Sequence, residues 1–234
     1  MTPALIAEHP DWLALHKPAG VSMHSEDGAG LVVQYQHWHG APLWPVHRLD
    51  RDTSGVLLMA RSAAAAATFG QLFQQRRVEK FYLGLSAQRP HRKMGVVAGD
   101  MTSGRNGNQR LLHTLERPAV TSFLSAAGGR GGRLLLMRPW TGRTHQLRVA
   151  MKAEGAPLRG DRRYGGAAAE HLCLHAWGVR FAWQGQWHQL QAPLPASPWY
   201  DDVVVQQQCR QWWPPFALTM PRPADTLLRR IGSQ

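Results

Sequence analysis

Residues 47–61 read HRLDRDTSGVLLMAR, and this stretch decides how the chain is organised. Its second half, residues 55–60, is an apolar run with the composition of a buried β-strand. Its first half places Asp50 and Asp52 among arginines and hydroxyl groups, directly before that strand. Neighbouring cations and loop hydrogen bonds hold a carboxylate in such a setting ionised. Polar side chains at the mouth of a core strand predict an active site, although an exposed loop of ion pairs would show the same pattern.

Two further strands carry polar or aromatic side chains. Residues 5–15 alternate as a strand and run into the segment HKPAG, where the proline and glycine should end the strand and turn Lys17 outward. Residues 78–85, VEKFYLGL, also alternate and place Lys80 and Tyr82 on one face. A strand tyrosine is usually a packing residue, so this pattern alone assigns no function to Tyr82.

The pattern over residues 139–148, PWTGRTHQLR, indicates a strand, a turn and a helix. Gly142 permits a tight turn, and apolar residues at i, i+3 and i+4 then predict a helix over residues 144–154 with Gly155 as its stop. Arg143 would lie at the N-terminus of this helix, where the positive end of the helix dipole disfavours a cation. An ordered acidic partner would offset that cost.

Further helices and strands should surround these segments. Ser62 should cap a helix through the alanine run that follows it, with Phe69 and Leu72 facing the core. Residues 119–125 and 133–137 have the composition of two sheet strands. The chain therefore alternates helices and strands around one central apolar strand.

Residues 89–117 form a polar, glycine-rich and basic segment. Gly104, Asn106 and Gly107 suit hairpin turns, and the arginines of the segment would suit contact with a phosphate backbone. A solvated loop would have the same composition, so both interpretations remain open.

Four of these segments together resemble the RluA-like pseudouridine synthases. The pattern HRLD, two variable residues, TSG and an apolar strand ending in AR resembles the catalytic-aspartate motif of that family, and KPAG resembles its first motif. The Lys-x-Tyr pattern of residues 80–82 resembles its second active-site element, and GRTHQLR resembles its third motif. Residues 155–165, GAPLRGDRRYG, resemble the segment that follows, in which Asp161 should brace the loop. The resemblance covers residues 13–195 and implies a mixed α/β fold, with a mostly antiparallel central sheet flanked by helices and an active cleft across its middle.

The resemblance also implies a set of functional side chains. Asp50 would be the nucleophile, Arg143 would form a salt bridge with it, and Tyr82 would stack on the target base. Arg48 would help to take that base out of the RNA stack, and Leu147 would form an apolar wall beside it. Further substrate contacts are expected from His47, Lys17 and Thr53.

The reaction that the resemblance implies is the conversion of uridine to pseudouridine in a structured ribosomal or transfer RNA. The N1–C1′ glycosidic bond breaks, the uracil rotates, and C5 joins C1′. Nothing is oxidised or hydrolysed, so we expect no cofactor and no metal. Possible metal ligands do occur at His37 and His39, and at His171, Cys173 and His175, but the first pair lacks a nearby Cys or acid and the second set has the alternating spacing of a strand.

Composition agrees with a nucleic-acid partner. The formal net charge is +12, and only 4 of the 27 basic residues are Lys, which leaves 23 Arg. Guanidinium groups pair bidentately with phosphate and stack on bases, although an anionic membrane surface or a coding bias toward Arg would fit the same count. Two cysteines give no disulfide framework, and no signal peptide or membrane-length apolar stretch occurs. We expect a cytoplasmic monomer that binds RNA and no membrane.

The resemblance ends near residue 195, which predicts the domain organisation. Residues 1–196 should form the catalytic domain, and residues 197–234 a C-terminal extension packed on it or trailing from it. Because KPAG begins so near Met1, we expect no S4-type RNA-binding domain before it.

Two other functions are compatible with parts of the sequence. Residues 50–53, DRDT, are similar to the Asp-x-Asp-x-Thr motif of haloacid-dehalogenase-like phosphatases, which require Mg²⁺. In those enzymes the Thr comes one position later and an apolar strand precedes the first Asp, whereas here the strand follows. A non-catalytic RNA-binding module would account for the charge without any active site.

Overall fold

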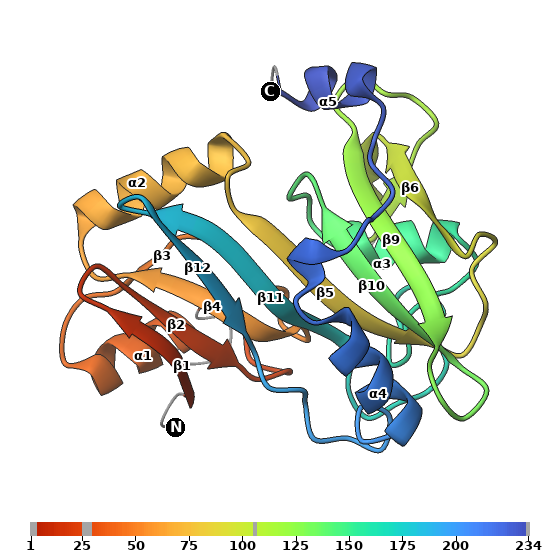
Figure 1. Ribbon diagram of the computed structural model, residues 1–234, viewed down its shortest axis with the longest axis horizontal. Coiled ribbons are helices and arrows are strands. Elements are labelled where there is room, and N and C mark those ends of the chain that lie inside the picture. The colour runs from red at the N-terminus through yellow and green to blue at the C-terminus, as the bar shows by residue number, and fades with distance from the viewer. Residues whose placement is uncertain (1–3, 25–29, 105–106, 233–234) are drawn as a thin grey trace. The chain divides into compact units, whose positions relative to one another are not determined.

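The computed structural model describes residues 4–24, 30–104 and 107–232 (Figure 1). Its contacts divide the chain into two compact units. The first unit comprises Met1–Lys80 and His175–Pro195, and the second comprises Phe81–Leu174 and Ala196–Gln234. Residues 197–234, expected as an extension, therefore belong to the second unit.

The sheet of the first unit has its strands in the order β1-β2-β4-β11, with β12 beside β11 and the short β3 beside β4. Neighbouring strands are antiparallel except for β4 and β11, which run parallel with Ser54 opposite His175. The strand bounds are Ala4–His9 (β1), Trp12–Lys17 (β2), Trp44–Pro45 (β3), Ser54–Ala60 (β4), Leu174–Trp183 (β11) and Gln186–Gln191 (β12). Residues 5–15, expected as one strand, are two, because a turn at residues 10–11 pairs His9 with Trp12.

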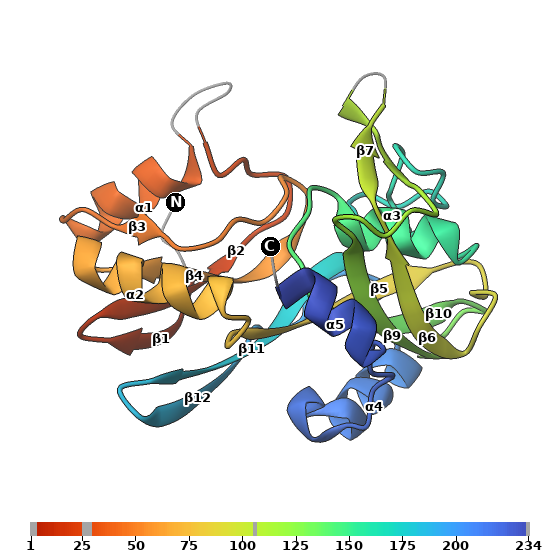
Figure 2. The same ribbon diagram turned by 90° about the horizontal axis from the view of Figure 1, so that it is seen from above.

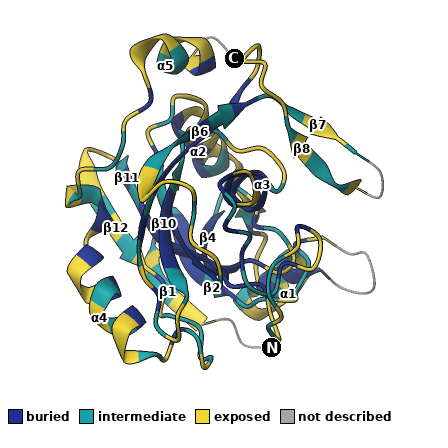
Figure 3. Cartoon of the chain, turned by 90° about the vertical axis from the view of Figure 1, so that its right-hand side faces the viewer, coloured by how far each residue is buried: buried dark blue, intermediate teal, exposed yellow. Residues whose placement is uncertain are grey.

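Both faces of β4 are covered, and every residue of this strand is buried (Figure 3). Alternate residues point to opposite faces of a strand. Val56 and Leu58 join the cluster that contains Phe69 of helix α2 (Ala63–Gln74), whereas Leu57 and Met59 join the cluster that contains Tyr35 of helix α1 (Leu31–His39). The first unit is thus a sheet between two helices, as expected for a central apolar strand.

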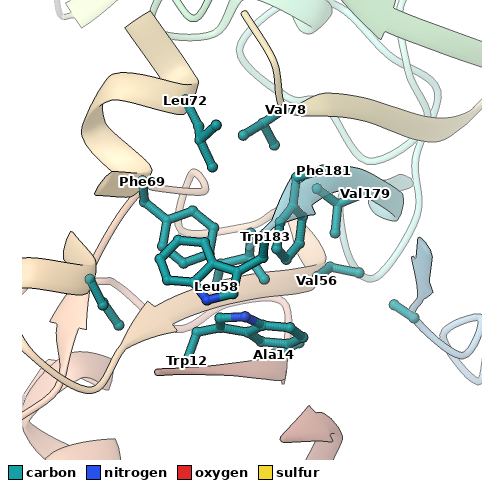
Figure 4. Close-up of a cluster of buried hydrophobic side chains, with 13 residues drawn as sticks. Trp12, Ala14, Val56, Leu58, Phe69, Leu72, Val78, Val179, Phe181 and Trp183 are labelled. Atoms are coloured by element: carbon teal, nitrogen blue, oxygen red, sulfur yellow. The ribbon is translucent and has the colours of Figure 1, made fainter. Parts of the chain in front are cut away.

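Aromatic rings fill the cluster on the α2 side of this sheet. Phe69 stacks on Trp183 with 4.5 Å between ring centroids, and Trp12 lies edge-on to Phe181 at 5.3 Å (Figure 4). The Oγ atom of Ser62 accepts a hydrogen bond from the amide of Ala65, which confirms the predicted cap of α2. Capping and aromatic burial together fix α2 on the sheet.

The second unit is built on a four-stranded antiparallel sheet in the order β5-β10-β9-β6. A separate hairpin of β7 and β8 stands apart from this sheet (Figure 2). The strand bounds are Glu79–Ser86 (β5), Met94–Gly99 (β6), Met101–Ser103 (β7), Gln109–Leu111 (β8), Ala119–Ala127 (β9) and Arg133–Pro139 (β10). Its helices are Gln146–Ala153 (α3), Val203–Trp212 (α4) and Asp225–Gly232 (α5), with a 3₁₀ turn at Pro215–Ala217.

Helix α3 begins later than the apolar spacing predicts. His145 has a φ of 56°, in the left-handed region, so helical geometry starts at Gln146 and not at Thr144. Gly155 has a φ of 73° just past the other end, which confirms it as the predicted stop. The periodicity of side chains located the helix, but it carries no information about the backbone angle of His145.

The predicted fold class is confirmed within both units. Helices flank strands that are antiparallel except for one parallel pair. Of the two interpretations left open for the basic segment, the structure has a hairpin, formed by β7 and β8, although Arg105 and Asn106 lie outside the described residues. None of the described helices is both long and apolar enough to cross a membrane.

A buried contact fixes the point where β4 and β11 meet. The Oγ atom of Ser54 lies 2.9 Å from Nδ1 of His175, which is fully buried. Gly55 has a φ of 117°, and a Cβ atom there would lie 2.2 Å from the carbonyl oxygen of Ala176. Only glycine suits this position, and the two backbones are therefore in direct contact where β4 begins.

The loop after α3 is braced by an ion pair inside the second unit. Arg148 donates to Asp161 through Nε at 2.7 Å and through Nη2 at 2.8 Å, and the Arg148 guanidinium lies 5.0 Å from the ring centroid of Tyr164. Asp161 also accepts a hydrogen bond from the amide of Tyr164. Asp161 therefore braces its loop, as the sequence predicts.

Replacing Asp161 by Asn should destabilise the protein strongly. Arg148 would remain buried without its counter-charge, which typically costs about 3–5 kcal/mol of unfolding free energy. Urea unfolding followed by circular dichroism measures the change. Asp225→Asn is the control, because Asp225 and its partner Arg222 are exposed and the midpoint should not move. Equal midpoints for the two variants would contradict a stabilising role for the buried pair.

Replacing His175 by Asn should make the fold less sensitive to acid. Burial lowers the pKa of His175 to about 3, so below pH 6.5 the unfolded chain binds a proton that the folded chain does not. Stability is therefore lost as pH falls below 6.5, and the His175 contribution at pH 5 is about 2 kcal/mol. The loss of unfolding free energy between pH 7 and pH 5 should shrink by that amount in the variant. The exposed His113 supplies the control substitution, and a variant that keeps the full loss would disprove the assignment.

Candidate active site

Asp50 lies in the loop that enters β4, between a buried side chain and an exposed one. Leu49 is buried, whereas Arg48 and Arg51 are exposed and Asp50 itself is half-buried. The amide of Thr53 donates to the carbonyl oxygen of Asp50 at 3.1 Å and closes a turn. The loop thus carries a half-buried acid close in sequence to two exposed arginines, of which Arg51 donates through Nε to the carbonyl oxygen of Gly20 at 3.2 Å.

Lys17 is buried beneath this loop. The prediction that it faces outward, made from its position before a proline, is therefore wrong. It is the last residue of β2, paired in register with Gly55 of β4, and its side chain is 0% exposed. Its ammonium donates to the carbonyl oxygens of Pro18, Arg51 and Thr53 at 2.8–2.9 Å. Burial lowers the pKa of Lys17 to about 8, against the charges of Asp52 and Asp50, which raise it. Lys17 therefore joins the HKPAG segment to the Asp50 loop.

His47, at the start of the loop, is bound to the strand that follows. Its Nε2 atom accepts a hydrogen bond from the amide of Leu58 at 2.9 Å, and its ring lies 5.5 Å from the ring of Phe73. Burial, together with the nearby charge of Lys80, lowers the pKa of His47 to about 3. His47 is therefore a neutral side chain whose Nε2 lone pair is already used.

The other end of the loop is held by the contact between Ser54 and His175. Both residues lie within the stretch that resembles the family, but 121 positions separate them in the sequence. Spacing alone offered no signal that would pair them. With Lys17 below the loop and His47 at its start, the Asp50 loop is fixed at three points within the first unit.

The remaining predicted side chains belong to the second unit. Tyr82 lies on β5 opposite Met137 of β10, with 8% of its surface exposed. Arg143 is exposed in the turn between β10 and α3, and Leu147 is buried in the first turn of α3. The predicted residues thus fall into two groups, with Asp50, Arg48, His47, Lys17 and Thr53 in the first unit and Tyr82, Arg143 and Leu147 in the second.

The turn that carries Arg143 is bound to a buried amide. Gln146, 5% exposed, accepts hydrogen bonds through Oε1 from the Arg143 amide at 3.0 Å and from the Thr141 hydroxyl at 2.7 Å. The backbone N–H of Gln146 in turn donates to the backbone carbonyl oxygen of Arg143 at 3.1 Å. The second unit therefore offers an exposed arginine on a hydrogen-bonded turn, four positions before the buried Leu147.

Within the described ranges, no group of three or more His, Cys, Asp or Glu side chains is placed to hold a metal ion. The chemistry available from the predicted residues is that of a fixed carboxylate, guanidinium groups and an aromatic ring. Such a set can attack or deprotonate a substrate, stabilise negative charge and stack on a planar base.

Comparison with known proteins bears on this set of residues. The RNA pseudouridylate synthase family matches residues 11–153, which include the Asp50 loop, Tyr82 and the turn of Arg143. An uncharacterized RNA pseudouridine synthase of Haemophilus influenzae is 36% identical over 208 residues, covering 87% of this chain and 93% of that protein. The ribosomal large subunit pseudouridine synthase C of Vibrio parahaemolyticus is 29% identical and covers 82% of this chain and 66% of that protein.

Solved structures show the same fold. The human RNA pseudouridylate synthase domain containing 1 aligns with a TM-score of 0.72 and 23% identity, over 95% of this chain and 97% of that chain. The human RNA pseudouridylate synthase domain containing 4 aligns with a TM-score of 0.69 and 21% identity. With a family match over more than half of its residues and a relative at 36% identity over most of its length, this chain belongs to the RNA pseudouridylate synthase family.

Proposed function

We propose that this chain converts a uridine of a structured ribosomal or transfer RNA to pseudouridine, with Asp50 as the side chain that starts the reaction. One observation carries the assignment. Asp50 is half-buried in a turn whose backbone is fixed by the ammonium of Lys17, and the charge of that ammonium interacts with the Asp50 carboxylate. Fixed position and neighbouring cations are what a nucleophilic carboxylate requires.

The reaction rearranges bonds without any net gain or loss of atoms. The Asp50 carboxylate attacks the nucleotide at C1′ or C6, or removes a proton from the sugar, and the N1–C1′ bond breaks. The freed uracil rotates, C5 joins C1′, the proton on C5 leaves to solvent and N1 takes up a proton. No electron acceptor or external nucleophile is consumed, so the protein must only expose the base, supply the carboxylate and retain the detached ring.

In this proposal the second unit supplies the contacts to the base. The Arg143 guanidinium pairs with the Asp50 carboxylate and keeps it charged, Tyr82 stacks on the uracil, and Leu147 forms an apolar wall. Support comes from the GRTHQLR motif and from the exposure of Arg143 on a turn that Gln146 holds. Taking a base out of its stack costs a few kcal/mol, and the exposed Arg48 is available to offset it.

Three residues expected to bind substrate have surroundings that favour positioning roles. Lys17 is bound by three carbonyl oxygens, His47 accepts from the β4 backbone, and Thr53 is 2% exposed with its amide bonded to Asp50. We therefore assign Lys17, His47 and Thr53 to the support of the Asp50 loop and assign direct RNA contact to Arg48. This division separates the side chains that should affect turnover from those that should affect binding.

The identity of the RNA and the setting of the reaction are parts of the same proposal. A net charge of +12 favours a polyanion, and RNA is read by shape and by its accessible loops. We take a uridine in such a loop as the target, a cytoplasmic monomer as the active form, and residues 1–196 as the catalytic region. The phosphatase alternative finds little support, because the long apolar strand β4 follows Asp50 and does not precede it.

Replacing Asp50 by Asn should abolish isomerisation and preserve RNA binding. The amide keeps the size of the side chain but removes the charge that the reaction needs. Transcribed ribosomal and transfer RNAs labelled with tritium at uracil C5 measure turnover by tritium release, and filter binding measures affinity. Asp52→Asn, two positions away on an exposed side chain, should retain activity. Tritium release by Asp50→Asn above roughly one hundredth of the unmodified rate would disprove the assignment, because loss of a nucleophile exceeds that factor.

Replacing Lys17 by Met should lower kcat while leaving KM nearly unchanged. The thioether fills the space of the stem but cannot bind the carbonyl oxygens of Arg51 and Thr53, so the loop loses its anchor. Loss of position by about 1 Å can reduce a rate on the order of 100-fold. The same tritium assay, run over a range of RNA concentrations on protein shown to be folded, separates the two constants. A raised KM with an unchanged kcat would instead identify Lys17 as a substrate-binding residue.

A further inference from the structure

One buried side-chain amide in the second unit has all of its hydrogen-bonding positions filled. The Oε1 atom of Gln146 accepts from the Thr141 hydroxyl and the Arg143 amide, as described above. Its Nε2 atom donates to the carbonyl oxygen of Val120 and to the hydroxyl of Thr121, both at 3.0 Å. A primary amide offers two donors and two lone pairs, so Gln146 is fully satisfied.

The orientation of this amide is determined by backbone groups on both sides. The carbonyl oxygen of Val120 can only accept, so a donor must face it. The amide of Arg143 can only donate, so an acceptor must face it. Oxygen and nitrogen of Gln146 therefore cannot exchange places. Of the other natural side chains, Glu matches this shape, and it carries a donor as well as an acceptor only when it is protonated.

The partners of Gln146 join an exposed turn to a rigid strand. Val120 and Thr121 lie on β9 and are 0% and 1% exposed. A second link runs parallel to the first, since the amide of Val120 donates to the Thr141 hydroxyl at 2.9 Å. The backbone around Arg143 is thus tied to a strand of the core through two side chains.

The turn needs such support because its own backbone is unfavourable. His145, between Arg143 and Gln146, has a φ of 56°, which costs a residue with a Cβ atom free energy relative to the helical region. The Arg143 side chain is exposed, so where its guanidinium can reach depends on where the turn places its backbone. Without Gln146 the turn would relax toward less strained angles and carry Arg143 with it.

We infer that Gln146 is a positioning residue for catalysis, whose buried amide holds the backbone of Arg143 where its guanidinium can serve the Asp50 carboxylate. This inference rests on the proposed function, in which Arg143 pairs with Asp50. Gln146 itself touches neither the RNA nor the reacting atoms, and its effect should therefore appear in kcat and not in RNA affinity.

Two substitutions test the hydrogen bonds of this side-chain amide. Gln146→Glu replaces the donor by an oxygen, and Gln146→Met removes both the donor and the acceptor. An ionised Glu turns an oxygen toward the Val120 carbonyl, so kcat at pH 8 should fall at least tenfold with KM changed less than threefold. Burial raises the pKa of such a carboxyl, and the protonated form regains a donor. The kcat ratio of Gln146→Glu to the unmodified protein should therefore rise at least fivefold from pH 8 to pH 6. Gln146→Met lacks donor and acceptor, so its ratio should be low and independent of pH.

The control is a glutamine that holds another part of the same unit. Gln206 on α4 donates through Nε2 to the carbonyl oxygen of Tyr200 at 2.8 Å, so Gln206→Glu makes the same chemical change away from the turn. Its kcat ratio should stay near one across the pH range. All assays use temperatures at which circular dichroism shows each variant fully folded, so a loss of stability alone would leave the ratios near one. A pH-independent ratio for Gln146→Glu would overturn the inference.

Arg143→Met separates a failure of the inference from a failure of the proposed function. If Arg143→Met is inactive and Gln146→Glu resembles the unmodified protein, Gln146 has no positioning role. If Arg143→Met retains full activity, the pairing of Arg143 with Asp50 is wrong and the proposed function must be revised. In a variant that carries Arg143→Met with residual turnover, adding Gln146→Glu should cause no further loss, because both substitutions remove the same contribution.

Discussion

The Asp50 loop depends on the hydrogen bonds that the buried ammonium of Lys17 donates to backbone carbonyl oxygens. An ammonium removed from water is unfavourable unless oxygen atoms replace its hydration, and here three backbone carbonyl groups do so. Carbonyl groups carry no net charge, so the ammonium of Lys17 keeps its electrostatic attraction to Asp50 and Asp52. The cation thus holds the loop together and also places positive charge near the Asp50 carboxylate. Because burial lowers the pKa of Lys17 to about 8, part of that charge is lost at mildly alkaline pH.

Each unit uses the same physical device to hold a loop that carries a proposed catalytic side chain. In the first unit a buried cation binds loop carbonyls, and in the second a buried amide binds both kinds of backbone group. In both cases the anchor is attached to a strand that is packed in the core, β2 for Lys17 and β9 at the far side of Gln146. Loops built in this way combine an exposed tip with the rigidity of a sheet, which is the arrangement that a preorganised active site needs.

Much of the fold could be predicted from local patterns. The alanine run, the cap at Ser62, the apolar strand after Asp50 and the stop at Gly155 each depend on neighbours within a few positions. The family and its fold were also predictable, since the motif of residues 47–61 combines chemistry and strand in one stretch. Local information was sufficient wherever the deciding contacts were local.

What the sequence did not predict falls into two kinds, contacts between residues distant in sequence and local backbone angles that side-chain patterns do not report. The proline and glycine after Lys17 predict that it faces outward. This prediction is wrong because two of the carbonyl groups that bind the buried ammonium lie 34 and 36 positions further along the chain. The link between Ser54 and His175 spans 121 positions. Helix α3 starts late because the left-handed angle of His145 depends on the turn that Gln146 holds, and side-chain periodicity does not report backbone angles.

The parallel pairing of β4 with β11 also has a consequence for protein synthesis. The ribosome makes β4, apolar on both faces, well before His175 and Ala176 emerge to cover its edge. At roughly 5–20 residues per second, the intervening segment takes about 6–24 s to translate. During that interval the nascent chain exposes an unpaired hydrophobic edge, a target for chaperones and for aggregation. The first unit is thus completed late in translation, after most of the second unit has already been made.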